Sequence, residues 1–249
     1  ARPASRGRGR SSGVRVTVAA MRRRSLLAVA GLALVLAGGC SGEDAAPQQP
    51  PAERLAAAKA VFDSAGSVAL DLSSRDVPSV ENGVTAARGD GVIAAADPKF
   101  QGTITGTVGG VAGTIDAIAI GDTAYLKLFT PEYEETDLDT LNAPNPALFF
   151  DTAVGISSLL TQTGDPKDGG QTRSGREVLT KIDGTLPGTR IEELFHLGDG
   201  TGTFTVSYGV TDTDELRTAT LKGPFFAGAE ATYLLTLTDY GAPVEITRP

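Results

Sequence analysis

Five acidic side chains within eight residues form the first group whose types and spacing could do chemistry; they are Glu132, Glu134, Glu135, Asp137 and Asp139. Two carboxyl groups at a fixed separation can hydrolyse a glycosidic bond, one as the acid and the other as the base or nucleophile. Glu134 and Asp137 are the candidates for such a hydrolase site. A dense acidic run without apolar periodicity is more typical of a solvated loop, so the pattern favours a protein that is not an enzyme.

Other reactive groups are sparse in the sequence. The only histidine, His196, lies near the end of a short predicted helix, where a cation suits the helix dipole and a surface cap is the more usual role. The acidic turn 212–215 and the glycine cluster 198–202 lack the spacing of a calcium loop or a phosphate-binding loop. With only one cysteine besides, we expect no catalytic residue, no metal site and no cofactor.

A targeting segment precedes the only cysteine. Met21 is followed by the three arginines 22–24 and by the apolar run 25–36, which is short for a helix that spans a bilayer. This order is typical of a signal peptide, so we expect residues 21–39 to be removed on export. Residues 1–20 would then be a non-native extension upstream of the true start at Met21; a real basic, disordered arm is the alternative.

Cys40 lies where bacterial lipoproteins carry their acylated cysteine. Segment 36–40 (LAGGC) resembles a lipobox, although Ala37 stands where that motif usually has leucine. A polar, proline-rich stretch follows, so we predict an acylated Cys40 and a flexible linker over residues 40–51. Acyl chains such as palmitate would anchor the protein at the extracytoplasmic face of the cell membrane. An unmodified cysteine at an ordinary cleavage site is the alternative.

The charge of the chain is divided unevenly along its length. Residues 1–24 hold eight arginines and no acid, which leaves 14 basic against 30 acidic residues downstream. A body with a net charge near −16 repels phosphates, so we expect no binding to nucleic acid. The same charge gives little electrostatic attraction to anionic lipid surfaces.

Residues 52–249 are predicted to form one α+β domain. Apolar residues at helical spacing predict helices that begin at residues 51 or 52, 147 and 187, the last two ending at 163 and 197. Residues 131–146 are acidic and turn-rich, and residues 163–175 are predicted to be a polar loop. About ten strands are predicted: 68–72, 84–96, 100–108, 111–120, 123–129, 176–183, 202–210, 215–221, 231–239 and 244–247.

Short turns between consecutive strands predict an antiparallel meander. We expect a large, strongly curved antiparallel sheet, a half-barrel, with helices packed across its concave face to enclose an apolar cavity. Alternation along the strands gives one apolar face and one threonine-rich face. Small apolar residues leave room for a ligand, but composition alone does not separate a cavity from a tightly filled core.

Strand parity and helix position give a set of candidate ligand-binding residues. The strands are expected to contribute Ile104, Val108, Ile118, Leu126, Phe204 and Val206 to the wall of the cavity. The helix over 147–163 is expected to contribute a movable wall through Phe149, Ile156 and Leu160.

Three stretches carry a resemblance to a known family: residues 116–125 (DAIAIGDTAY), the helical region 149–160, and residues 233–244 (YLLTLTDYGAPV). Together with the signal and linker, they resemble the LppX/LprAFG lipoproteins of actinobacteria, in particular the LprG-like members, over about residues 53–249. The resemblance implies a half-barrel as in LolA and LolB. It also implies a cavity for the acyl chains of envelope glycolipids, and a major-facilitator transporter as a candidate partner.

Two functions of different kinds stay open at this point. The first is a monomeric, membrane-anchored lipid carrier that binds acylated lipids or glycolipids and moves them across the cell envelope. The second is a structural or interaction lipoprotein with a filled core and no catalytic activity.

Overall fold

The structure is a computed structural model that describes residues 49–80, 82–128 and 130–249. These residues belong to one compact unit. The expected extension 1–20, the signal peptide 21–39, Cys40 and most of the linker 40–51 lie outside the described residues. Within the described part of the chain, no helix combines the length and the apolar character needed to cross a membrane.

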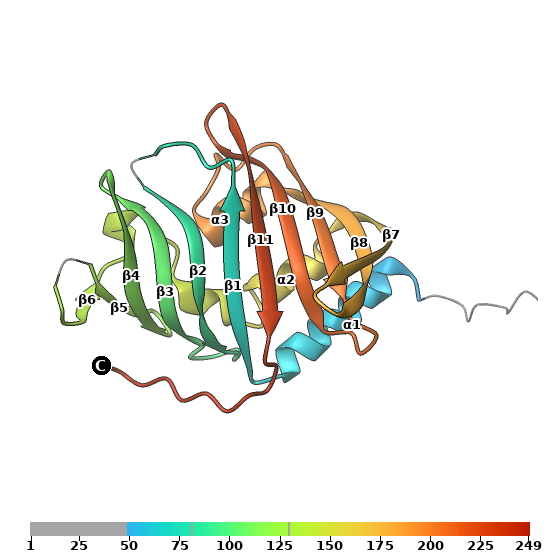
Figure 1. The fold of residues 1–249 in the computed structure, drawn as a ribbon, viewed down its shortest axis with the longest axis horizontal. Coiled ribbons are helices and arrows are strands. Elements are labelled where there is room, and N and C mark those ends of the chain that lie inside the picture. Colours follow the sequence, from blue (N-terminus) through green and yellow to red (C-terminus); the bar gives the residue numbers. More distant parts are fainter. Residues whose placement is uncertain (1–48, 81, 129) are drawn as a thin grey trace, which may run out of the picture. The chain divides into compact units, whose positions relative to one another are not determined.

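Eleven antiparallel strands form one curved sheet in the described residues (Figure 1). The first and last strands, β1 and β11, pair at its centre, so two meanders run outward from there to the edge strands β6 and β7. The strands are β1 Ser67–Arg75, β2 Gly83–Val92, β3 Lys99–Val108, β4 Val111–Ile120, β5 Thr123–Lys127, β6 Glu134–Thr136, β7 Gly164–Ser174, β8 Glu177–Pro187, β9 Thr203–Val210, β10 Leu216–Phe226 and β11 Ala229–Thr238.

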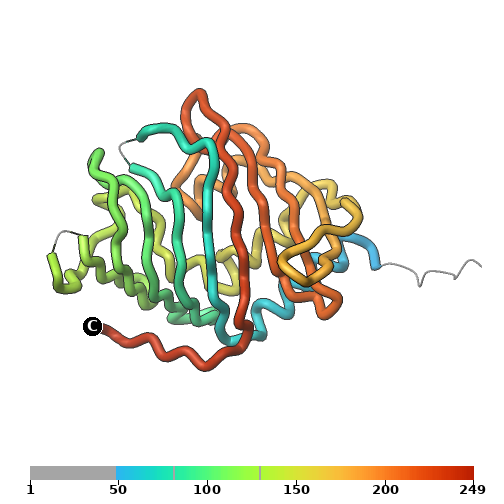
Figure 2. Tube along the Cα trace, in the orientation of Figure 1, coloured from blue at the N-terminus to red at the C-terminus, as the bar shows by residue number. Residues whose placement is uncertain are grey.

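The strand order forces one long connection across the sheet. Because β6 and β7 lie at opposite edges, the chain between them has to span every other strand. This crossing segment, residues 137–163, contains two 3-10 helices and one α-helix: η1 Asp139–Leu141, η2 Pro146–Phe150 and α2 Ile156–Thr161. Figure 2 shows the segment, in yellow, behind the strands.

Two further helices complete the covering of the concave face. Helix α1, Pro51–Ser64, buries Leu55, Ala58 and Phe62 and packs against α2. Helix α3, Gly188–Phe195, buries Ile191 and Leu194 and packs against β8. The side chains that all these elements bury against the sheet form one hydrophobic cluster.

Irregular register bends the sheet. The pairing shifts in β2 between Val84 and Ala86, and in β10 near Leu216 and Gly223. An extra residue in one strand bends that strand and increases its twist. The predicted α+β class and the curved antiparallel half-barrel are confirmed, with eleven described strands instead of about ten.

The predicted polar loop over 163–175 is wrong, because these residues form the edge strand β7. A strand needs only backbone hydrogen bonds to one neighbour, and β8 supplies them although most side chains of β7 are exposed. Pro166, Lys167 and register shifts in this strand are typical of an edge that is protected against pairing with another chain.

The predicted strand over 244–247 is also wrong. The last strand, β11, ends at Thr238, and both of its edges are already paired, with β1 and β10. The chain that leaves it therefore finds no free edge beside it. It continues as an extended tail in which Ile246 is buried.

The single helix predicted over 147–163 is divided into η2 and α2. Between them, the carboxylate of Asp151 accepts hydrogen bonds from the backbone N–H groups of Ala153 (2.6 Å) and Val154 (2.9 Å). This local turn satisfies donors that a continuous helix would bond internally. It lets the segment change direction as it crosses the sheet.

Candidate functional site

An apolar cavity of about 250 Å³ lies between the concave face of the sheet and the elements that cross it. Side chains from β1–β5 and β8–β11 form the sheet wall. Residues of η1, η2, α2 and the end of α3 form the opposite wall. The crossing segment is therefore both the connection between the sheet edges and the cover of the cavity.

Six of the nine residues predicted to bind a ligand lie in the wall of this cavity. They are Ile104, Val108, Leu126, Phe149, Ile156 and Val206. The structure thus brings residues of three strands, η2 and α2 together around one space. Their binding of a ligand stays a prediction.

The other three predicted residues are buried outside the lining. Ile118 has the wrong parity: its neighbour Ala117 lies opposite Leu126, which lines the cavity, so Ile118 points to the outer face. Phe204 lies against the sheet with its ring over Gly223, where an added Cβ would be 2.3 Å from that ring. Leu160 belongs to the hydrophobic cluster, while Ile156 and Leu159 are the residues of α2 that face the cavity.

Sequence reasoning missed two lining residues in the acidic stretch. Leu138 and Leu141 lie in or beside η1 and line the cavity, although acidic residues surround them in the sequence. No periodicity marks them, because η1 is a single turn. Their apolar character within a charged stretch was the only available signal.

The cavity wall carries no charge among the residues described. None of its lining residues is Asp, Glu, Lys or Arg, and its buried hydroxyl groups are already bonded. Tyr233 donates to the carbonyl of Val84 (2.8 Å), and Tyr208 pairs with the hydroxyl of Thr163 (2.9 Å). Burial raises the pKa of Tyr233 to about 12 and also raises that of Tyr208, so both phenols stay neutral.

One end of the sheet, here called the mouth end, is where the cavity meets solvent. It is the end at which β3 leads into β4 and β10 leads into β11. The exposed lining residues Asn82 and His196 lie there, at the start of β2 and the end of α3, and the exposed Asn142 after η1 also lines the cavity. They are uncharged or weakly basic groups that can exchange hydrogen bonds with a polar headgroup.

The opposite end, here called the far end, is closed by aromatic side chains. Phe150 of η2 is fully buried and stacks on Phe100, with ring centroids 6.1 Å apart. A Cβ on Gly91 would come within 2.1 Å of the Phe150 ring, so glycine is required for this approach. Phe62 of α1 meets Tyr240 edge to face at 6.2 Å.

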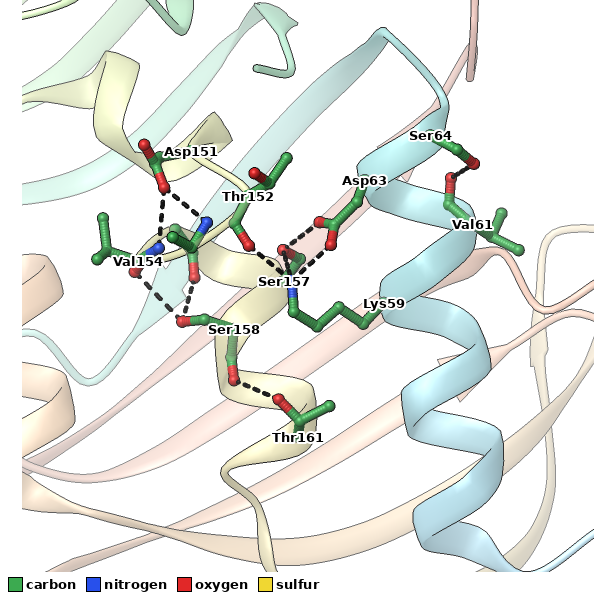
Figure 3. Close-up of polar contacts among 12 residues, drawn as sticks. Lys59, Val61, Asp63, Ser64, Asp151, Thr152, Val154, Ser157, Ser158 and Thr161 are labelled. Carbon is green, nitrogen blue, oxygen red and sulfur yellow. Dashed lines mark hydrogen bonds and ion pairs between the residues drawn. The ribbon is translucent and has the colours of Figure 1, made fainter. Parts of the chain in front are cut away.

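A polar clamp joins the cavity wall to α1 (Figure 3). Ser157 of α2 is fully buried and donates to Oδ1 of Asp63 at 2.7 Å. Lys59 contacts Oδ2 of the same carboxylate at 2.5 Å and donates to the carbonyl of Thr152 at 2.6 Å. The clamp fixes the outer side of α2, while Ile156 on the same helix faces the cavity.

The acidic run does not form part of the cavity. Its carboxylates at 132, 134, 135, 137 and 139 belong to exposed residues, and none of them is among the lining residues. Asp137 accepts a hydrogen bond from the backbone N–H of Asp139 at 3.0 Å, which stabilises the start of η1. Within the described residues there is no group of three His, Cys, Asp or Glu side chains placed to hold a metal ion.

Comparison with known proteins identifies relatives of this chain. A family model described as "LppX_LprAFG lipoprotein" matches residues 50–246. The fold is similar to that of LprF from Mycobacterium bovis, with a TM-score of 0.68 and 15% identity over 80% of this chain and 96% of that chain. Lipoprotein LppX from Mycobacterium tuberculosis gives a TM-score of 0.58 and 18% identity over 79% and 97% of the two chains. No curated protein sequence matches.

The described residues belong to one compact unit. The described residues 49–249, which contain the complete hydrophobic cluster, are therefore a suitable fragment for experiments.

Proposed function

The chain belongs to the LppX/LprAFG lipoprotein family, and we propose that it carries a membrane lipid with the acyl chain in the apolar cavity. The lipid headgroup would stay at the mouth end, beside Asn82 and His196. The protein would bind its cargo and release it unchanged, as a carrier and not as an enzyme.

The observation that carries this proposal is an apolar cavity whose wall contains no Asp, Glu, Lys or Arg and whose inner hydroxyl groups are already bonded. Away from its opening, such a wall offers no partner to a polar ligand and favours an apolar one. Each buried methylene contributes about 0.8 kcal/mol, so a chain of about 14 methylenes gives about 11 kcal/mol. Several kcal/mol of that gain offset the lost freedom of protein and ligand.

The size of the cavity suggests how much lipid it takes. A volume of about 250 Å³ lies just below the usual range for sites that bury a small molecule. We infer that this form accommodates one acyl chain, and that a second chain requires displacement of the crossing segment. A glycolipid is the favoured cargo, because sugar hydroxyl groups match the amide and imidazole groups at the mouth end.

The proposal also includes a lipid anchor at Cys40 and a transporter as partner. Acylation of Cys40 would hold the carrier at the extracytoplasmic face of the membrane, and a major-facilitator transporter would be its partner. Mass spectrometry of the membrane form tests the anchor: an acylated Cys40 supports it, and a free thiol contradicts it.

Filling the cavity tests the function directly. Ile104→Trp places an indole in the lining of the cavity, so uptake of a fluorescent fatty acid by residues 49–249 should weaken at least tenfold. Thr103→Trp adds the same side chain at the neighbouring exposed position on the outer face and should leave uptake unchanged. If Ile104→Trp folds and takes up the fatty acid as well as the wild type, the cavity is not the binding site.

A further inference from the structure

Three neighbouring stretches at the mouth end contain no charged side chain: residues 77–80 (VPSV) within the loop between β1 and β2, residues 107–114 (TVGGVAGT) and residues 223–229 (GPFFAGA). Val111, in the second loop, is 58% exposed, the highest value for a large hydrophobic residue in the described chain. Gly109, Gly110, Ala227 and Gly228 at the tips of the two hairpins are exposed as well. Figures 1 and 2 show both hairpins projecting at the same side of the sheet.

Contacts between the loops make them one surface. The side chain of Asn82 accepts a hydrogen bond from the backbone N–H of Gly109 at 2.8 Å. Val80 and Phe226 both lie beside Gly83, where an added Cβ would be 2.9 Å from Val80 and 3.8 Å from Phe226. We call residues 77–80, 107–114 and 223–229 the apolar tip.

The tip adjoins the opening of the cavity. Asn82, Gly83, Thr107 and Val108 belong to the cavity lining and lie within or directly beside these loops. A ligand that passes between solvent and cavity at this end therefore passes the apolar tip.

The far end of the same sheet is different, because its turns are acidic. Asp97 lies between β2 and β3, Asp122 between β4 and β5, and Asp212 and Asp214 between β9 and β10. In a body with a net charge near −16, a patch without charge is a marked departure. The mouth end carries acids as well, at Asp76 and Asp199, but the tips of its two hairpins, residues 109–112 and 227–228, contain none.

We propose that the apolar tip docks on the surface of a lipid bilayer composed mainly of zwitterionic lipid, with the mouth of the cavity facing the membrane. Small apolar loops can enter the headgroup region without the cost of desolvating a charge. The bordering acids Asp76, Glu81 and Glu230 and the acidic body disfavour an anionic surface and tolerate one that exposes ammonium groups. An acyl chain would then move between bilayer and cavity without crossing water. This proposal rests on the lipid-carrier function.

The tight turn at the tip of the second loop suits a shallow insertion. Gly109 and Gly110 both have positive φ, 57° and 79°, the two-residue turn that joins strands most tightly. Val108 and Val111 pair across it and therefore share one face of the sheet. Val108 lines the cavity, and Val111 is exposed.

Flotation with phosphatidylcholine vesicles tests the docking. Residues 49–249 are used, so that neither Cys40 nor the targeting segment contributes. Val111→Asp should lower the vesicle partition coefficient at least tenfold, and Ala227→Asp on the other hairpin should lower it as well. Val178→Asp is the matched control, because Val178 is also exposed (45%) but lies at the start of β8, at the far end; its partition should change less than twofold.

Uptake of a fluorescent fatty acid from solution tests the carrier function without a membrane, and so distinguishes it from the docking proposal. Val111→Asp should retain uptake, which also shows that it is folded, while Ile104→Trp should lose uptake and still float with vesicles. The docking proposal would be overturned if Val111→Asp and Val178→Asp changed the vesicle partition coefficient equally, or if the wild type did not float with vesicles. Either result would leave the carrier function in place. A wild type that floats but takes up no fatty acid would overturn the carrier function.

Discussion

The two ends of the sheet are built from the same eleven strands, yet they differ in closure, charge and packing. At the far end, Phe100, Phe150 and Phe62 fill the space between sheet and helices, and the turns carry aspartates. At the mouth end, the lining residues Asn82 and His196 are exposed, and the tips of the two hairpins are apolar. In an antiparallel sheet, alternate connections lie at opposite ends, so a sequence can give each end its own chemistry.

The difference also separates stability from function. Phe150 and Phe62 are fully buried and do not line the cavity, so their truncation creates a new cavity. Side chains around the existing cavity already face a space, so their truncation removes less packing. We therefore expect the far end to dominate the free energy of unfolding and the mouth end to dominate lipid binding.

The largest effect is expected from a pair of adjacent phenylalanines. Phe150→Ala at the far end should lower the free energy of unfolding by about 3–5 kcal/mol, because it empties a fully buried site. Phe149→Ala should lower it by only about 1 kcal/mol, because this half-buried ring lines the cavity. Urea denaturation of both variants measures the difference, and equal losses would remove the distinction between the two ends.

A smaller effect is expected from the polar clamp between α1 and α2. Ser157→Ala should lower the free energy of unfolding by about 1–3 kcal/mol, because it removes a fully buried hydroxyl that donates to the Asp63 carboxylate. Ser64→Ala is the control, since the exposed hydroxyl of Ser64 donates only to the carbonyl of Val61 in its own helix (Figure 3). If thermal unfolding shows the same small change for both, the clamp does not hold the cavity wall.

The smallest effect is expected from Tyr233, which lines the cavity. Tyr233→Phe should cost about 1 kcal/mol near neutral pH, because the carbonyl of Val84 loses its donor. Burial raises the pKa of Tyr233 from 10.0 to about 12. The unfolded chain therefore releases this proton first, and the stability that Tyr233 contributes, present below pH 10, is lost as pH rises toward 12.

Free energies of unfolding measured across this alkaline pH range test whether the pKa of Tyr233 is raised in the folded state. The wild type should lose stability more steeply than Tyr233→Phe. Parallel pH profiles for the two proteins would show that Tyr233 ionises as readily in the folded state as in the unfolded state.

The alternation of apolar and polar residues along the strands predicted the sheet and much of the cavity lining. It identified lining residues correctly only in strands whose larger apolar side chains face the cavity. Ile104, Val108 and Val206 follow that rule. Residues 116–120 do not, because Ala117 and Ala119 face inward while the larger Ile118 faces outward. When both faces of a strand are apolar, as here in β4, the sequence does not show which residues face the cavity. Only the pairing of β4 with β5 decides it.

Two further differences come from backbone interactions that side chains do not reveal. The polar residues of β7 form a strand because β8 offers a free edge. Residues 244–247 (VEIT), in which apolar and polar side chains alternate, do not form one, because no edge is free beside them. Neither outcome depends on local propensity. The strand order that decides both is a long-range property, set by the pairing of β1 with β11 at the centre of the sheet.

Mass spectrometry of an organic extract tests the central claim most directly. Residues 49–249, purified from the native host or a close relative, should release an acylated lipid in stoichiometric amount, and Ile104→Trp should release little or none. A wild-type domain that is free of lipid and also refuses added glycolipid would contradict the account. The protein would then be an interaction lipoprotein whose cavity stays empty.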